Sequence, residues 1–498
     1  MTAPIPATGR RGRALGLLLS AVLAQGCTTY RIVRWRDPAP NVQHRIFPER
    51  TVHAADAPFH FTRAALRTDL DTVRVRDVDG VLRPFDEYFA RRSIRAFVVV
   101  RNDTLLYERY DAGYGPATRS SSFSVAKSVT SALLGLALER GQVRSINDSI
   151  TRYLPELEGN ANYHGITVRQ LLGMQSGLAY TQAEGSLWQQ LRSSDAHFYY
   201  TNDRPRSLRG MRRADSPGAR WAYKDSDTEL LGLILARATR QTIAVQLQES
   251  IWRRIGTEHD ASYSLDRPDG VENVSGGLNA TALDYARFGR LYLHYGAWNG
   301  QQVLPRRWVE QSTTLDTTRT EPEVTTWYRM QHQQQWWLPM HNWAGERDFF
   351  ADGSRGQRIY VHRPTGTIIV QVADDSDQEF PFRRIAHYLK GEPYRYPVGI
   401  AGAVLRAGRT FGADSARSVF QRLTRAMNEP PAEYTVNEAG LLSVTATLAA
   451  EQRDEAADAL LDLVRERYPG SCAVHRMLLA RRPATVWVPP PRCAPAPP

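Results

Sequence analysis

The segment Ser124-Val-Ala-Lys127 pairs a hydroxyl with an amine in a chain that almost never uses lysine. The 498 residues include sixty arginines and three lysines, so a lysine at this position stands out. An ammonium can lose its proton when it is withdrawn from water, whereas a guanidinium stays charged. A serine three residues before a lysine therefore indicates a nucleophile and its base.

The residues after Ser124 predict the helix that would position this pair. From 124 to 140, apolar residues recur at helical spacing, at Val125, Val129, Ala132, Leu133 and Leu136. Because residues three apart share one helix face, the hydroxyl and the amine can meet. If Ser124 begins the helix, burial and the helix dipole should lower the pKa of Lys127. The Ser124 amide can then act as one of two oxyanion donors.

The flanking sequence predicts strands on either side of a helical middle. Residues 97–110 alternate around Asn102-Asp103 as a hairpin does, and residues 357–373 form a second hairpin pattern. Helices are predicted over residues 168–174, 229–238, 282–295, 438–450 and 454–468. The chain is therefore expected to be an α+β protein with Ser124 where strands meet helices.

Four blocks of sequence follow one another in order along the chain. They read FSVAKSVTS (123–131), ITVRQLLGMQSGL (166–178), PGARWAYKDSDTELLG (217–232) and GGLNATALDYARFG (276–289). Together they resemble the serine hydrolases of the β-lactamase and penicillin-binding superfamily. The resemblance is greatest to the class C-like branch, which holds carboxylesterases, D-aminopeptidases and 6-aminohexanoate-dimer (nylon-oligomer) hydrolases, and it covers about residues 60–395. It implies a β-lactamase/transpeptidase-like fold, with an antiparallel sheet flanked by helices and a helical subdomain.

The resemblance also implies roles for single residues. Ser124 would be the acylated nucleophile, Lys127 its base, and Tyr223 the phenol that passes a proton to the leaving group. A tyrosine packed in the core, with its hydroxyl bonded, is the alternative reading of Tyr223. Gly353 would allow close backbone approach, and the Ser354 amide would complete the oxyanion hole. The implied substrate is a small ester or amide, and no cofactor is implied.

Two positions depart from the antibiotic-hydrolysing members of this superfamily. Asp225 stands where class C enzymes carry asparagine, and an ionised carboxylate cannot donate a hydrogen bond to a β-lactam side chain. Ala351 stands where those enzymes carry the lysine that holds a penicillin carboxylate. Both departures favour the esterase and nylon-oligomer branch. Arg355 could supply the missing cation, or it could be an ordinary surface arginine.

Rival functions remain open at this point. One is a penicillin-recognising sensor or scaffold that becomes acylated without turning over, and others are a peptidoglycan D,D-peptidase or a β-lactamase. An aromatic cluster could line an acyl pocket, although aromatic residues are more often core. Its members are Trp327, Tyr328, Trp336, Trp337, Trp343, Phe349 and Phe350.

Other chemistries find little support in the sequence. The twelve histidines show no His-x-x-x-His spacing, no Cys-x-x-Cys is present, and Asp77-Val-Asp79-Gly80 lacks the rest of a calcium loop. No metal or nucleotide is implied. The net charge is +11, but no block of five or six basic residues occurs, so nucleic acid is not a predicted partner.

The first 26 residues predict an export signal. Three arginines precede the apolar run 14–24, which is too short to span a bilayer. Ala24-Gln25-Gly26-Cys27 resembles a lipobox, so we expect a lipoprotein anchored through Cys27, with plain secretion or an uncleaved anchor as alternatives. Thr28 after this cysteine favours the outer membrane, and the expected location is the periplasm-facing cell envelope.

The rest of the chain divides by composition. We predict an N-terminal arm over residues 27–60, a hydrolase domain over 61–395, a C-terminal helical region over 396–482 and a Pro-rich tail over 483–498. The C-terminal region resembles a degenerate tetratricopeptide helix pair, which would either pack on the main domain or bind a partner. In an oxidising compartment, Cys472 and Cys493 would pair or remain as two thiols.

Overall fold

The computed structural model describes most of the chain. The described residues are 28–35, 39–77, 81–111, 113–182, 187–316, 330–339, 346–374, 381–391, 398–426, 434–436 and 438–481. The predicted leader with Cys27, the tail with Cys493, and the aromatic residues Trp327, Tyr328 and Trp343 lie outside them. None of the described helices combines the length and the apolar character that a membrane crossing requires.

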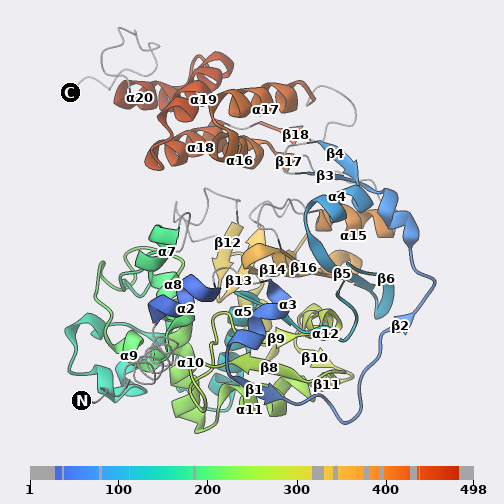
Figure 1. Ribbon diagram of the computed structural model, residues 1–498, viewed down its shortest axis with the longest axis vertical. Helices are drawn as coiled ribbons and strands as arrows, with labels where there is room; N and C mark the ends of the chain where they lie inside the picture. Colours follow the sequence, from blue (N-terminus) through green and yellow to red (C-terminus); the bar gives the residue numbers. More distant parts are fainter. Residues whose placement is uncertain are drawn as a thin grey trace, which may run out of the picture.

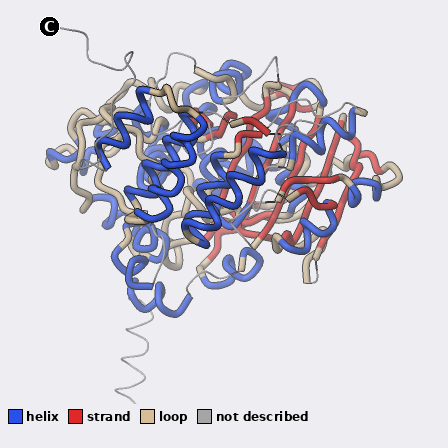
Figure 2. The backbone as a smooth tube through the Cα atoms, turned by 90° about the horizontal axis from the view of Figure 1, so that it is seen from above, coloured by secondary structure: helices blue, strands red, loops and turns tan. Residues whose placement is uncertain are grey.

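A large sheet forms the centre of the molecule (Figure 2). In spatial order its strands are β12 (Met330–Gln333), β13 (Trp336–Pro339), β14 (Asp348–Gly353), β15 (Gln357–His362), β16 (Thr367–Ala373), β5 (Ile94–Arg101), β6 (Thr104–Tyr110) and β2 (Thr62–Arg63). Neighbouring strands are antiparallel, except that the edge strand β2 runs parallel to β6. The sheet is therefore mixed. A two-residue strand carries no alternating pattern, so sequence patterns could not predict this edge.

Strand β5 shows why both faces of the sheet are covered. Successive strand residues point to opposite faces. Ala96, Val98 and Val100 lie in a core shared with the helices α5 and α12, whereas Phe97 and Val99 lie in a second core shared with α4 and α15. These helices are α5 (Val125–Glu139), α12 (Ala282–Leu293), α4 (Phe85–Arg91) and α15 (Phe382–Lys390). Helices thus flank the sheet on both sides.

A helical subdomain packs on the far side of α5 (Figure 1). It contains α6 (Val168–Leu172), α7 (Leu187–Arg192), α8 (Ser194–Tyr200), α9 (Arg204–Arg209), α10 (Asp225–Thr239) and α11 (Ile243–Leu247). Helix α10 contacts both α5 and α6, so α5 lies between the large sheet and this subdomain. The predicted helices over residues 124–140, 168–174, 229–238 and 282–295 and both predicted hairpins are confirmed.

The described N-terminal segment packs against the helical subdomain and a small second sheet. It begins with α2 (Thr28–Trp35) and α3 (Pro40–Gln43), and its strand β1 (Glu49–Val52) pairs with β8 (Ala261–Ser264). That small antiparallel sheet continues through β9 (Leu278–Ala280) to β7 (Ser120–Ser121). Shorter elements are β3 (Arg74–Arg76), β4 (Leu82–Pro84), β10 (Ala297–Trp298), β11 (Gln301–Gln302) and α13 (Arg306–Ser312).

The C-terminal helices form a layer of their own at one end of the long axis (Figure 1). They are α16 (Ala401–Phe411), α17 (Ala413–Ala426), α18 (Glu438–Ala450), α19 (Asp454–Arg467) and α20 (Cys472–Arg481), next to a parallel pair of β17 (Val398–Gly399) and β18 (Tyr434–Thr435). The helices share a separate hydrophobic core. The predicted pair of helices is thus confirmed as α18 and α19. Cys472 is disulfide-bonded, and its pairing with Cys493 stays a prediction.

Candidate active site

Ser124 stands at the start of α5, immediately before Val125, the first residue of the helix. Phe123 before it has a φ of 43°, in the left-handed region that a residue with a large side chain rarely adopts. The chain therefore turns sharply at the point where the helix begins. The Ser124 hydroxyl makes no capping bond to the helix, which leaves this oxygen for other contacts.

Lys127 lies one turn further along α5, and its buried ammonium contacts three acceptors. Its Nζ donates to Ser124 Oγ at 2.8 Å and to the carbonyl oxygen of Ser275 at 2.9 Å. The third contact is an ion pair with Asp225 Oδ1 at 2.5 Å. An ammonium has three N–H donors, so each has a partner. The predicted contact between Ser124 and Lys127 is present in the structure.

The protonation of Lys127 differs from the sequence prediction. Burial lowers the pKa of this ammonium, as we predicted, but Asp225 and Tyr223 together raise the pKa more, and its value lies above the usual one. The prediction of a lowered pKa was wrong because it considered the helix of Lys127 alone. Asp225 is the first residue of α10 and approaches Lys127 from a distant part of the chain. In the resting site, Lys127 is an ammonium.

Tyr223 is the third residue of the predicted catalytic group, and it lies next to Lys127. Its ring centroid lies 5.0 Å from Lys127 Nζ, and the nearby side chains of Lys127 and Ser124 act on the pKa of its phenol. Burial raises the pKa of Tyr223, Lys127 lowers it and Asp225 raises it again, with a net increase. The phenol therefore keeps its proton at neutral pH and can donate it. Tyr223 lies at the site and is not an ordinary core tyrosine.

A second layer of buried groups holds the carbonyl that Lys127 contacts. Glu229 Oε1 accepts from the Ser275 amide at 3.0 Å and from its hydroxyl at 2.6 Å, while Arg204 Nε lies 3.4 Å from Glu229 Oε2. The next amide, of Gly276, donates to Asn273 Oδ1 at 2.9 Å. The loop just before Gly276-Gly277 therefore positions the amine of Lys127.

The end of β14 approaches Ser124 closely. A β-carbon added at Gly353 would lie 3.1 Å from the Ser124 amide nitrogen and would collide with the Ser122 carbonyl. Only glycine fits there, and it brings the backbone of Gly353 and Ser354 beside the start of α5. This neighbourhood supports the predicted pairing of the Ser124 and Ser354 amides as oxyanion donors, which remains a prediction.

The cation that would anchor a substrate carboxylate is not found at the predicted positions. Ala351 is fully buried on β14. Arg355, two residues after Gly353, forms an ion pair with Asp374. Its charge is therefore balanced within the protein, while 24% of its side chain stays exposed.

Aromatic rings surround Tyr223. Its centroid lies 5.8 Å from that of Trp337, 5.8 Å from that of His332 and 6.4 Å from that of Trp221. Of the predicted aromatic cluster, Trp337 lies at the site. Trp336, Phe349 and Phe350 are buried in the two cores, as expected for most aromatic residues.

Gln335 fixes the hairpin that carries His332 and Trp337. Its carbonyl accepts from Ser128 Oγ at 2.6 Å, its side-chain oxygen accepts from Thr228 at 2.9 Å, and its amide donates to the Leu172 carbonyl at 2.8 Å. The turn between β12 and β13 is thus bonded to α5, α10 and α6. Sequence reasoning missed His332, Trp221, Gln335 and Ser275 because no local pattern marks them.

The model of the family described as Beta-lactamase matches residues 81–390. The chain belongs to this family. The resemblance seen in the sequence blocks is therefore confirmed, and the matched range contains the whole group around Ser124. The C-terminal helices α16 to α20 lie beyond the matched range.

Individual proteins are also similar to this chain. It is 27% identical over 300 residues to the 6-aminohexanoate-dimer hydrolase of Paenarthrobacter ureafaciens, covering 57% of this chain and 73% of that protein. Protein flp of Staphylococcus aureus (strain COL) is 24% identical over 179 residues, covering 33% of this chain and 34% of that protein. A solved structure titled "Putative 6-aminohexanoate-dimer hydrolase from Bacillus anthracis" superposes with a TM-score of 0.63 at 26% identity, covering 73% of this chain and 95% of that chain.

Proposed function

We propose that this β-lactamase-family hydrolase cleaves small esters or linear amides through an acyl-enzyme on Ser124. The observation that carries the proposal is the 2.8 Å contact of Ser124 Oγ with Lys127 Nζ, together with the ring of Tyr223 5.0 Å from the same nitrogen. A nucleophile, an amine and a proton donor thus meet at the start of one helix. Removing any one of these contacts would leave the other two groups without a complete proton path.

The proposed steps use these three side chains. The neutral amine of Lys127 takes the Ser124 proton as Oγ bonds to the carbonyl carbon, and the Ser124 and Ser354 amides hold the oxyanion. The bond to the leaving group then breaks. Tyr223 protonates that group and regains a proton from the Lys127 ammonium. A water molecule attacks the acyl-enzyme in the same way, with Lys127 taking its proton and returning one to Ser124.

The surroundings of the site favour uncharged or zwitterionic chains over antibiotics. Ala351 offers no cation for a β-lactam carboxylate, and Arg355 is paired with Asp374. Trp221 and Trp337 supply apolar surface beside Tyr223, which suits an alkyl or aminohexanoyl chain. The similarity to a relative named 6-aminohexanoate-dimer hydrolase supports a linear amide as one substrate.

One substrate panel tests this proposal. We expect short p-nitrophenyl esters and the linear aminohexanoate dimer to be turned over with a kcat/KM on the order of 100-fold above that for a D-Ala-D-Ala peptide or a chromogenic cephalosporin. The reason is that both disfavoured substrates carry a carboxylate next to the scissile bond, where the site offers no cation, whereas the carboxylate of the dimer lies several methylene groups away from its amide. Faster turnover of the D-Ala-D-Ala peptide would instead support a peptidoglycan peptidase. Stoichiometric acylation by a penicillin, with no turnover of any panel member, would support the sensor.

The Asp225→Asn variant tests whether Asp225 controls the protonation state of Lys127. Because Asp225 raises the pKa of Lys127 and the neutral amine is the reactive form, kcat/KM of the wild type should rise with pH well into the alkaline range. Without the carboxylate, burial still lowers the pKa of Lys127 and only Tyr223 opposes it, so the ascending limb should move to lower pH. The fraction of neutral amine at pH 7 should grow about tenfold for each pKa unit of this change.

The pH profiles of the wild type and two variants decide the outcome. Asp215→Asn is the matched control, since Asp215 forms a surface ion pair with Arg220 and should leave the profile unchanged. An ascending limb that stays in place or moves to higher pH in Asp225→Asn would show that Asp225 does not control the base.

A further inference from the structure

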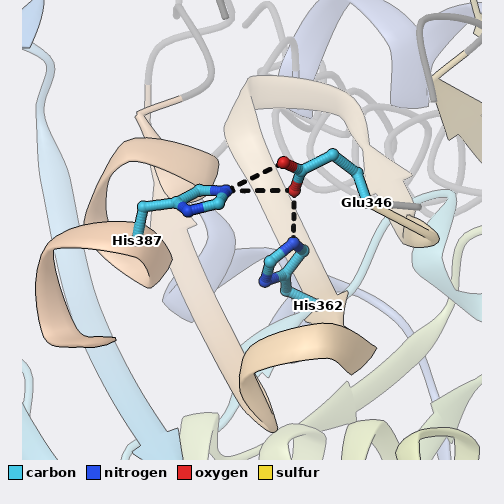
Figure 3. A group of neighbouring side chains, drawn as sticks. All are labelled: Glu346, His362 and His387. Carbon is cyan, nitrogen blue, oxygen red and sulfur yellow. Dashed lines mark hydrogen bonds and ion pairs between the residues drawn. The ribbon is translucent and has the colours of Figure 1, made fainter. Parts of the chain in front are cut away.

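Three side chains from separate parts of the chain converge on one point (Figure 3). They lie at the start of β14, whereas Gly353 at its other end lies beside Ser124. Glu346 lies just before β14, His362 is the last residue of β15, and His387 lies on α15. Glu346 Oε2 lies 2.5 Å from His362 Nε2, and Glu346 Oε1 lies 2.9 Å from His387 Nε2. The exposed fractions are 4%, 0% and 9% respectively. Two imidazoles and one carboxylate thus share one buried point.

The hydrogen bonds of His362 determine what its Nε2 presents to the carboxylate. The hydroxyl of Thr365 donates to Thr367 Oγ1 at 2.8 Å, so it has no proton left for His362. At 2.7 Å from that oxygen, His362 Nδ1 is therefore the donor. In the neutral imidazole, Nε2 then carries a lone pair that faces Glu346. Two lone pairs at this distance repel unless a cation lies between them.

We propose that Glu346, His362 and His387 form a binding site for a divalent transition-metal ion of the zinc type. Two histidines and one glutamate are an established zinc ligand set, and a fourth position would be left for water. Around a tetrahedral ion with bonds of about 2.0 to 2.1 Å, ligand atoms lie about 3.3 Å apart. The three ligand atoms lie within 4.8 Å of one another, so small side-chain movements admit the ion.

The neighbouring groups are compatible with an added positive charge. Arg383 is the nearby cation, with its Nε 3.9 Å from Glu346 Oε2. However, its guanidinium pairs with both carboxylate oxygens of Asp348, at 2.7 and 3.0 Å, which offsets its charge. Thr365 holds the His362 ring through Nδ1, the kind of contact that orients a metal-binding histidine.

This site is distinct from the one at Ser124. Gly353, at the other end of β14, lies beside Ser124, and the intervening residues span roughly 20 Å of strand. An ion here would join α15 to β15 and to the segment just before β14, and it would stabilise the fold without entering the reaction. The sequence implied no metal because the ligands come from three elements, so that no His-x-x-x-His spacing arises.

Zinc binding to the full purified chain tests the proposal, after chelator treatment and equilibrium dialysis. We expect about one zinc ion per chain, a rise in Tm of about 3 °C or more at saturating zinc, and visible bands of four- or five-coordinate cobalt when Co²⁺ replaces zinc. His387→Gln and Glu346→Gln should lose the ion and the Tm shift. His387→Gln is the milder change, because His387 is the most exposed ligand.

Two control variants separate this site from the rest of the chain. His294→Gln removes a half-exposed histidine near Asp103, and Ser124→Ala removes the proposed nucleophile; both should bind zinc as the wild type does. The proposal would be overturned if the wild type bound no zinc, or if Glu346→Gln and His387→Gln bound as much zinc as the wild type. The contacts would then be explained by a protonated His362 that donates to both Glu346 and Thr365. If both variants fail to fold, the wild-type stoichiometry and cobalt spectrum decide.

Discussion

Replacing Ser124 with Ala is expected to lower kcat by a factor on the order of 10⁴ or more, because the atom that bonds to the carbonyl carbon is lost. The fold should tolerate the change. Ser124 makes no side-chain capping bond to α5, and its hydroxyl is an acceptor for Lys127. The loss would therefore be chemical, and the variant should melt near the wild-type temperature.

Intact-mass analysis after fluorophosphonate treatment measures this result directly. The wild type should gain one adduct and Ser124→Ala none. Ser216→Ala is a suitable control, since Ser216 is an exposed serine on the same domain and its loss should leave both labelling and turnover unchanged. Labelling that persists in Ser124→Ala would remove Ser124 as the nucleophile.

Local periodicity was enough to predict the contact between Ser124 and Lys127. Two residues three positions apart on a helix lie on the same face, and this does not depend on the rest of the fold. Tyr223 and Asp225 could be placed near them only through the order of the sequence blocks. The sign of the Lys127 pKa shift depended on the distance to Asp225, which no spacing along the chain encodes.

Adjacent residues on a strand show where sequence reasoning ends. Trp336 and Trp337 are equally aromatic, yet the first is buried in the core and the second contacts Tyr223. They point to opposite faces of β13, and the sequence does not say which face meets the site. The contact of the Ser275 carbonyl with Lys127 and the cluster around Glu346 could not be predicted for a related reason. Backbone oxygens and ligands from distant parts of the chain leave no motif in the sequence.

Lys127→Arg should reduce kcat/KM by a factor on the order of 10³, although the positive charge is kept. A guanidinium stays protonated at every pH at which the protein is folded, so it cannot take the Ser124 proton. Arginine can still pair with Asp225, whose carboxylate lies 2.5 Å from the Lys127 nitrogen in the wild-type structure. The variant therefore keeps the electrostatic contact and loses the base.

Steady-state kinetics from neutral to alkaline pH separate these two contributions of Lys127. The residual activity of Lys127→Arg should show no ascending limb that belongs to an amine, whereas Lys390→Arg, the same exchange at an exposed position, should keep the wild-type rate and profile. Near-normal turnover by Lys127→Arg would mean that the positive charge beside Ser124 suffices. The role of base would then pass to Tyr223, whose ring lies 5.0 Å from the same amine.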